Sequence, residues 1–161
     1  MFESHTPPAA VISQPFSVDI STSTAIAASA ESVWATLMEA AAYPAWSPFI
    51  RSIHGVIAEG QRISVELQLH GRKPQRVRPR IVAVEPPRCL EWLGQIGPRG
   101  VFDARHRFEI RANGETSCEL VHSERLTGLL VPLVRSMLTG PTPAAFIAHN
   151  LVLKSKVEHG G

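Results

Sequence analysis

The chain has 161 residues, of which 44% are hydrophobic and 19% are charged, and its formal net charge is +2. This length and composition predict a single globular domain with a real core. A net charge so close to zero argues against a general nucleic-acid binder, so we expect no DNA partner. No stretch approaches the ~18 apolar residues that a membrane-spanning helix needs.

The two cysteines, Cys89 and Cys118, lie inside strand-like runs and neither belongs to a CxxC pair. Their isolation disfavours a disulfide framework or a zinc ribbon, and we interpret both as reduced packing residues. Residues 1–16 carry three prolines among small and polar residues, which predicts a flexible N-terminal arm. This arm lacks the basic start and apolar run of a secretory signal, so the default location is the cytoplasm.

The predicted domain spans residues 17–158 and begins with a strand over Ser17 to Ala27, where apolar residues weakly alternate. Ser29 can cap a helix that runs to about Ala40, because its apolar residues fall at helical spacing. A short second helix is expected over Ala41 to Ser47, where Pro44 and Pro48 prevent a longer one.

Four strand-like runs follow closely: Phe49 to Ile57, Gln61 to Leu69, Gln75 to Val84 and Arg88 to Ile96. Their short connections predict antiparallel neighbours. Pro79 lies inside the third run, which indicates an edge position or a bulge because proline cannot donate to a sheet ladder.

Two further strands, Val101 to Ala112 and Glu115 to Leu126, flank an Asn113-Gly114 turn. A two-residue turn would set the apolar side of one strand against the polar side of the other, so we predict a three-residue loop ending at Gly114. Histidines 106 and 122 would then be diagonal neighbours on one face. The loop would place three pairs opposite one another: Phe108 and Cys118, His106 and Leu120, and Phe102 and Glu124.

The last predicted element is a helix over Pro143 to Val157 with Thr142 as its cap. Three- and four-residue steps put Phe146, His149, Asn150 and Leu153 on one face. Strands followed by one long helix predict an α+β domain.

Five short patterns occur in order along the chain: Ala30-Glu31-Ser32-Val33-Trp34, Tyr43 to Phe49, Glu85 to Trp92, His106-Arg107-Phe108 and Ser123 to Leu130. With these motifs the sequence resembles the START-like, or SRPBCC, superfamily, in its polyketide cyclase/dehydrase-like branch. The resemblance implies a helix-grip fold, in which a curved antiparallel sheet of about six to seven strands wraps the long C-terminal helix, with two short helices after the first strand. It also implies a cavity between sheet and helix for lipids, polyketides or other apolar molecules. The family shares no catalytic residue that could be transferred to this chain.

The candidate catalytic residues are His106, His122 and Glu124, which interrupt an otherwise apolar sheet face. An inward histidine is also common as a hydrogen-bonded core residue, and Glu124 could instead be solvated at a rim. A buried carboxylate without a cation would be a candidate general acid or base. The predicted ligand-binding residues are Trp46, Trp92, Phe102, His106, Phe108, Leu120, His122, Phe146, His149, Asn150 and Leu153. No cofactor is expected, and two histidines without a third ligand make a poor metal site.

Arg76, Arg78 and Arg80 alternate along the third run and predict one charged strand face. It is either a solvated edge that discourages aggregation or a docking surface for an acidic partner, a phospholipid head group or RNA. Three functions therefore stay open: binding of a hydrophobic small molecule in an internal cavity, a polyketide cyclase/dehydratase-type enzyme that uses the cavity His and Glu residues, and a ligand-free protein-interaction module. The sequence does not distinguish a monomer from a dimer.

Overall fold

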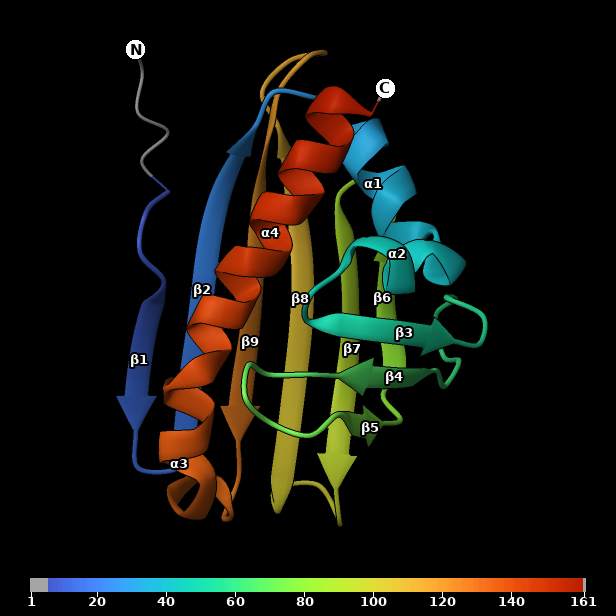
Figure 1. Cartoon of the computed structure of the whole chain (residues 1–161). Coiled ribbons are helices and arrows are strands. Elements are labelled where there is room, and N and C mark those ends of the chain that lie inside the picture. The colour runs from blue at the N-terminus through green and yellow to red at the C-terminus, as the bar shows by residue number, and fades with distance from the viewer. Residues whose placement is uncertain (1–5, 161) are drawn as a thin grey trace.

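Two antiparallel sheets and a long C-terminal helix make up the fold in a computed structural model that describes residues 6–160 (Figure 1). The large sheet has the strand order β1-β2-β9-β8-β7-β6. Its strands are β1 (Ala10–Gln14), β2 (Ser17–Ile26), β6 (Arg80–Glu85), β7 (Cys89–Ile96), β8 (Phe102–Ala112) and β9 (Cys118–Thr127). The small sheet, which crosses in front of it in Figure 1, contains β3 (Ile50–His54), β4 (Ser64–Leu67) and β5 (Gln75–Val77).

Four α-helices pack on the inner side of the large sheet or at its ends. They are α1 (Ala30–Met38), α2 (Tyr43–Trp46), α3 (Val131–Thr139) and α4 (Pro141–His159), with a 3₁₀ turn at Ala40–Ala42 between the first two. The side chain of Ser29 accepts a hydrogen bond from Ser32 N at 3.2 Å, so the predicted helix cap is confirmed. The α+β class, the curved antiparallel sheet and the closing helix are also confirmed.

Helix α4 runs diagonally over β2 and β9 (Figure 1) and presents the side that the sequence predicts. Its buried residues include Phe146, His149, Asn150 and Leu153. Polar contacts attach the C-terminal end of α4 to the end of β2. Lys154 Nζ donates a hydrogen bond to the carbonyl of Ala25 at 2.7 Å. Glu158 accepts from the backbone N–H of Ala27, also at 2.7 Å. The helix is therefore held along its length against the inner side of the sheet.

The predicted loop between β8 and β9 is wrong in length, although the predicted strand faces are correct. Ala112 pairs with Cys118, so the connection covers residues 113–117 instead of three residues. Phe108 then lies opposite His122 instead of Cys118. This moves the register by four residues along β9, and an even shift keeps every side chain on its predicted face. His106 lies opposite Glu124 instead of Leu120, and remains a diagonal neighbour of His122.

Two strand predictions also need correction. Part of the expected flexible arm is β1, which pairs with β2 at the edge of the large sheet, while residues 1–5 lie outside the described part of the chain. The single strand expected over Gln75 to Val84 is two strands in different sheets, because the chain leaves β5 after Val77 and enters β6 at Arg80. Pro79 lies at this break, as expected for a residue without an N–H group.

The C-terminal prediction is also incomplete. Helix α3 lies where only a connection was expected, and α4 begins at Pro141 with Gly140 as its N-cap residue. Thr142, the predicted cap, is instead a buried residue of the first helical turn. The two helices together extend the apolar cover of the sheet beyond the predicted single helix.

Gly128 allows the chain to turn sharply from β9 into α3. Its φ is +129°, and a Cβ atom there would approach the carbonyl carbon of Val101 to 2.7 Å. The N–H of Leu130 donates to the carbonyl of Val101 at 3.0 Å, which holds the start of α3 beside the start of β8. Only glycine tolerates both the positive φ and this close approach.

We predict that Gly128→Ala lowers the free energy of unfolding by about 2–4 kcal/mol, because the new methyl group collides with backbone. Gly114→Ala is the matched control, since Gly114 also has a positive φ (+93°) but its Cβ would meet nothing within 4 Å. That variant should lose only about 1–2 kcal/mol from the backbone conformation. Urea unfolding of both variants measures the difference, and equal losses would contradict the close approach at Val101.

Candidate functional site

An apolar pocket of about 250 Å³ lies between the small sheet, the ends of β8 and β9, and helix α3. The small sheet and its flanking loop contribute Leu67, Leu69 and Val77, and the large sheet contributes Phe102, Ala104 and Leu126. Helix α3 and the residue before it close the other side with Leu130, Val134, Met137 and Leu138. Apolar side chains that converge from separate elements on one hollow are typical of a small-molecule site.

Few polar groups reach this pocket. Glu124 contributes an acidic group from β9. Arg72 and Lys73 contribute their side chains from the loop before β5, and Gln75 contributes its side chain as the first residue of β5. The side chain of Glu124 is 17% exposed, and its Oε1 lies 3.8 Å from Nδ1 of His106. Glu124 therefore belongs both to the pocket wall and to the buried polar cluster behind it.

That cluster consists of His106 on β8, His122 on β9, Asn150 on α4 and Thr22 on β2, all of them buried. The Nε2 atoms of His106 and His122 are 2.8 Å apart, and His122 Nδ1 lies 2.8 Å from Asn150 Oδ1. Asn150 Nδ2 donates to Thr22 Oγ1 at 2.9 Å. Burial, followed by the neighbouring His106 and His149, lowers the pKa of His122 well below its ordinary value. His122 is therefore a neutral imidazole with both ring nitrogens hydrogen-bonded.

His149 on α4 belongs to a separate buried contact. Its Nδ1 lies 2.9 Å from Ser47 Oγ, which also accepts from the N–H groups of Phe49 and Ile50. A hydroxyl that accepts two hydrogen bonds has its own proton to give, so Ser47 donates to His149. Burial lowers the pKa of His149 to about 3. Its Nε2 has no hydrogen-bond partner among residues 6–160 and lies within a group of aromatic rings.

Aromatic packing fills the region where the sequence places the cavity. The ring of Trp92 stacks on His106 with a centroid distance of 4.9 Å and an interplanar angle of 8°. Phe146 stacks on His122 at 4.0 Å, and Phe108 lies 4.4 Å from the same imidazole. The centre of the sheet beneath α4 is thus a packed aromatic and imidazole layer, and the pocket lies beyond it toward α3.

The structure divides the predicted site residues into two groups. Phe102 and Glu124 line the pocket. The others are Trp46, Trp92, His106, Phe108, Leu120, His122, Phe146, His149, Asn150 and Leu153, which are buried or partly buried in the core behind it. The α3 residues of the wall were missed, although Leu130, Val134 and Leu138 recur at a helical spacing of four.

A shallow groove of about 600 Å³ shares Phe49 and Leu69 with the pocket. Its other walls are the turn between β4 and β5, with His70 and Gly71, and the small residues Ala144 and Ala148 of α4. The two hollows therefore adjoin on the side of the molecule where the small sheet approaches the first turns of α4.

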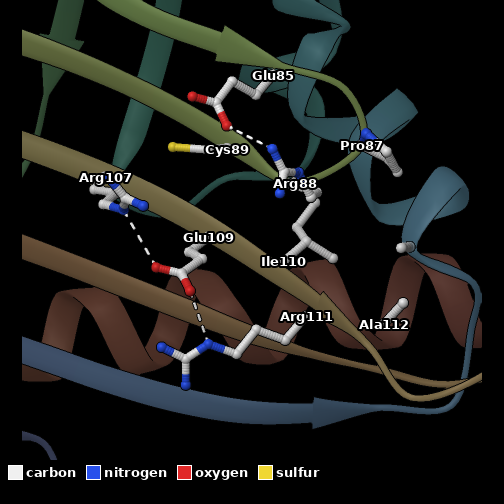
Figure 2. Close-up of a pocket in the computed structure, with 10 residues that line it drawn as sticks. Glu85, Pro87, Arg88, Cys89, Arg107, Glu109, Ile110, Arg111 and Ala112 are labelled. Atoms are coloured by element: carbon white, nitrogen blue, oxygen red, sulfur yellow. Dashed lines mark hydrogen bonds and ion pairs between the residues drawn. The ribbon is translucent and has the colours of Figure 1, made fainter.

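A third hollow, of about 320 Å³, lies on the outer face of the large sheet (Figure 2). Figure 2 shows Glu109 between Arg107 and Arg111, and Glu85 beside Arg88. The carboxylate of Glu109 lies 3.3 Å from Arg107 and 2.8 Å from Arg111, and that of Glu85 lies 3.0 Å from Arg88. Because each guanidinium already contacts a carboxylate, this hollow is an ion-pair network and a weaker candidate for a ligand. Cys89 lies here, and burial raises the pKa of its thiol.

The structure also locates the cysteines and the arginines that the sequence analysis named. Cys89 and Cys118 are buried free thiols, as expected. Arg76 lies 3.7 Å from Glu66, and Arg78 and Arg80 are exposed where the chain passes between the sheets, so the three arginines do not share one strand. Across residues 6–160, no three His, Cys, Asp or Glu side chains are grouped to hold a metal ion. No helix in the same range is long and apolar enough to cross a membrane.

Comparison with known proteins agrees with this architecture. The sequence profile of the family described as "Polyketide cyclase / dehydrase and lipid transport" matches residues 17–151. The chain belongs to this family. Curated protein sequences gave no match.

Solved structures with the same fold include a norcoclaurine synthase point mutant from Thalictrum flavum in complex with a transition state analogue. It is 17% identical, with a TM-score of 0.68 over 94% of this chain and 99% of that one. A START superfamily protein from Mycobacterium smegmatis is 20% identical, with a TM-score of 0.68 over 89% and 99%. The Zhui aromatase/cyclase from Streptomyces sp. R1128 is 18% identical, with a TM-score of 0.67 over 90% and 98%. These structures confirm the helix-grip fold, and the family match confirms the predicted resemblance to the polyketide cyclase/dehydrase-like branch.

We predict that acid destabilises this protein through its buried histidines. In the unfolded chain a histidine binds a proton below pH ~6.5, whereas folded His122 and His149 remain neutral because burial lowers the pKa of each. The unfolded state then holds more protons, so the free energy of unfolding falls as the pH drops below ~6.5, by roughly 1 kcal/mol per pH unit for each histidine.

Urea unfolding of His149→Gln measures one of these two contributions. The slope between pH 6 and pH 4 should become smaller by roughly 1 kcal/mol per pH unit than in the original chain. His70→Gln, at an exposed position, is the matched control and should keep the original slope. An unchanged slope in His149→Gln would show that, between pH 6 and pH 4, His149 binds a proton in the folded protein as readily as in the unfolded chain.

Proposed function

We propose that this protein binds an apolar small molecule in the pocket between the small sheet and α3. The main observation is the pocket wall itself, in which twelve aliphatic, aromatic and thioether side chains from both sheets, their flanking loops and the α3 region surround a hollow of about 250 Å³. Membership of a family whose description includes lipid transport supports the same function. The adjoining groove beside α4 offers a path by which a ligand could reach the pocket from solvent.

The expected affinity is moderate. Burial of ~300 Å² of apolar ligand surface at ~25 cal/mol per Å² offers ~7 kcal/mol before the cost of ordering the ligand and side chains. That free energy corresponds to micromolar binding at best, and it depends on area more than on ligand shape. We therefore expect the pocket to accept several related apolar ligands with similar affinity.

Ala104→Phe tests this proposal, because Ala104 lines the pocket from β8 and a phenyl ring there would occupy much of the hollow. An apolar fluorescent dye, and fatty acids that displace it, should bind the original chain and raise its melting temperature. Both effects should disappear in Ala104→Phe. Ala25→Phe, on the exposed side of β2, is the matched control and should bind like the original chain. Equal dye binding by all three proteins would place the ligand elsewhere.

A second candidate function is acid–base catalysis of the cyclase or dehydratase type. One specific observation favours it: Glu124 lines the apolar pocket while its carboxylate lies 3.8 Å from the imidazole of His106. A carboxyl and an imidazole together can donate one proton and accept another, as cyclisation and loss of water from a polyketone require. The family description names both polyketide cyclases and dehydrases.

If the protein is such an enzyme, Glu124→Gln should lower turnover of a linear triketone by about 10²–10⁴-fold, since the amide cannot transfer the proton. The absorbance of the aromatic product, recorded across pH, measures the rate. Glu119→Gln is the matched control, because Glu119 lies on the same strand but on the outer face of the sheet. Full turnover by Glu124→Gln with an intact fold would exclude this mechanism and leave the binding function standing.

A further inference from the structure

Buried hydrogen-bonding side chains form a path from β2 to His106, which lies beside the pocket wall. Thr22, Asn150, His122 and His106 follow one another at separations of 2.8 to 2.9 Å, and Oε1 of Glu124 lies 3.8 Å from Nδ1 of His106, beyond hydrogen-bond distance. The first three are at most 2% exposed and His106 is 3% exposed, so water does not compete for these contacts. Where water is excluded, the position of the proton in one hydrogen bond determines which atom donates in the next hydrogen bond.

The hydroxyl of Thr22 determines which atoms donate in the Thr22–Asn150 and Asn150–His122 hydrogen bonds. Its hydroxyl donates to the carbonyl oxygen of His122 at 2.9 Å, because that oxygen can only accept. The hydroxyl proton is thereby used, so Thr22 must accept from Asn150, which turns the NH₂ group of Asn150 toward Thr22. The amide oxygen of Asn150 then faces His122 Nδ1 and can only accept. It follows that Nδ1 of His122 carries a proton.

His122 cannot carry a second proton at its other nitrogen without becoming a buried cation. Burial lowers its pKa well below the ordinary value, so the ring is neutral and its Nε2 is a bare acceptor. The facing nitrogen of His106 must then be the donor across the 2.8 Å contact. With its proton at Nε2, neutral His106 has a bare Nδ1, and this atom is the one that faces Glu124 Oε1.

We infer that the unprotonated Nδ1 of His106 points toward the carboxyl group of Glu124 at the wall of the pocket, and that Thr22, Asn150 and His122 are positioning residues that fix this arrangement. The 3.8 Å between Nδ1 and Oε1 is longer than a hydrogen bond, so His106 supplies no donor that satisfies Glu124. The carboxyl group therefore keeps an acceptor oxygen for a hydroxyl group of the occupant of the pocket.

Other charged groups near the pair leave this arrangement intact. Arg72 and Lys73 line the same pocket from the loop before β5, and both are exposed to solvent. His149 is the nearest other imidazole on α4, and burial keeps it neutral. Arg125, the next residue along β9, lies 3.7 Å from Asp19 and is exposed. The remaining neighbours of the His106 ring are aromatic: Trp92, Phe108, Phe49 and Phe146.

This arrangement defines the class of ligand more narrowly, an extension that rests on the proposed binding function. An apolar compound with one hydroxyl group directed at Glu124 can donate a hydrogen bond to its carboxyl group, whereas a hydrocarbon of the same shape leaves that group without a partner. A site built to hydrogen-bond a hydroxyl group rejects the analogue that lacks it, because its polar groups then lose a partner. The pocket should therefore select hydroxyl-bearing apolar molecules.

The first test reads the protons directly in the ligand-free protein. Long-range ¹H–¹⁵N correlation spectra of histidine-labelled protein distinguish the two neutral tautomers and the imidazolium. At pH 7 we expect His122 as the neutral form with its proton on Nδ1, the tautomer less common in free histidine, and a proton on Nε2 of His106. A proton on Nε2 of His122, or an imidazolium at that residue, would overturn the inference whether or not any ligand binds.

Asn150→Leu provides a second readout that a purely structural role of Asn150 would not move. Without the amide oxygen, His122 loses the acceptor that fixes its proton on Nδ1, and its tautomer should change. Glu124→Gln should leave the His122 tautomer unchanged, since the hydrogen bonds from Thr22 to Asn150 and from Asn150 to His122 do not involve residue 124. An unchanged His122 tautomer in folded Asn150→Leu would contradict the positioning role.

The ligand class is tested with naphthalene and 1-naphthol, two flat probes that differ by one oxygen. We expect 1-naphthol to bind about tenfold more tightly to the original chain, the ratio that one good hydrogen bond provides. In Glu124→Leu, which has no acceptor oxygen, this ratio should move toward one. Equal affinities in the original chain would overturn the proposed ligand class. Failure of both probes to bind would instead contradict the binding function, while the tautomer measurement would still decide the proton arrangement.

Discussion

The two hydrogen bonds made by the ring of His122 belong to a buried network that joins four elements at the centre of this fold. Through Asn150 they connect β9 to α4, through Thr22 they extend to β2, and through His106 they extend to β8. A buried imidazole with a missing partner would cost about 1–3 kcal/mol. The orientation of α4 on the sheet is therefore constrained by polar geometry as well as by the burial of Phe146 and Leu153.

This constraint also determines where a ligand can be accommodated. Because the imidazoles must stay within 2.8 Å of their partners, α4 lies close to the sheet there, and Trp92, Phe108 and Phe146 fill the remaining space. The apolar pocket lies where α4 begins and the helical layer continues as α3. Gly128 permits that continuation, since it lets the chain turn beside Val101 into the helix that forms one pocket wall.

The sequence predicted strand faces better than strand partners, and the reason is physical. Side chains alternate with a period of two, so an error of four residues in the β8–β9 register left His106, His122 and Glu124 on the correct face. Strand β1 gave no signal because all five of its residues are exposed and nothing imposes alternation. Helix α3 was hidden by Pro132 at its second position and by Gly140 after its end.

The position of the pocket could not be predicted in the same way. Alternation and helical spacing identified which side chains point inward, but two elements can be packed tightly or held apart with the same inward residues. The distance between them depends on the His122–Asn150 contact and on the crossing of the small sheet, both of which join residues far apart in sequence. Phe102 and Glu124 were found because they lie on an inward face near a strand end, where the packed layer stops.

Affinity and selectivity arise from different parts of this pocket. The apolar wall can contribute several kcal/mol to any ligand of suitable size, whereas a single hydrogen bond contributes about 1 kcal/mol to one oxygen. In the proposed binding function, affinity would therefore depend on α3, the small sheet and the apolar side chains of β8 and β9. Discrimination would depend on the carboxyl group of Glu124 beside His106, whose tautomer is set by the hydrogen bonds that lead back to Thr22. A related ligand of similar apolar area should then bind with similar affinity, whereas an analogue without the hydroxyl group should bind more weakly.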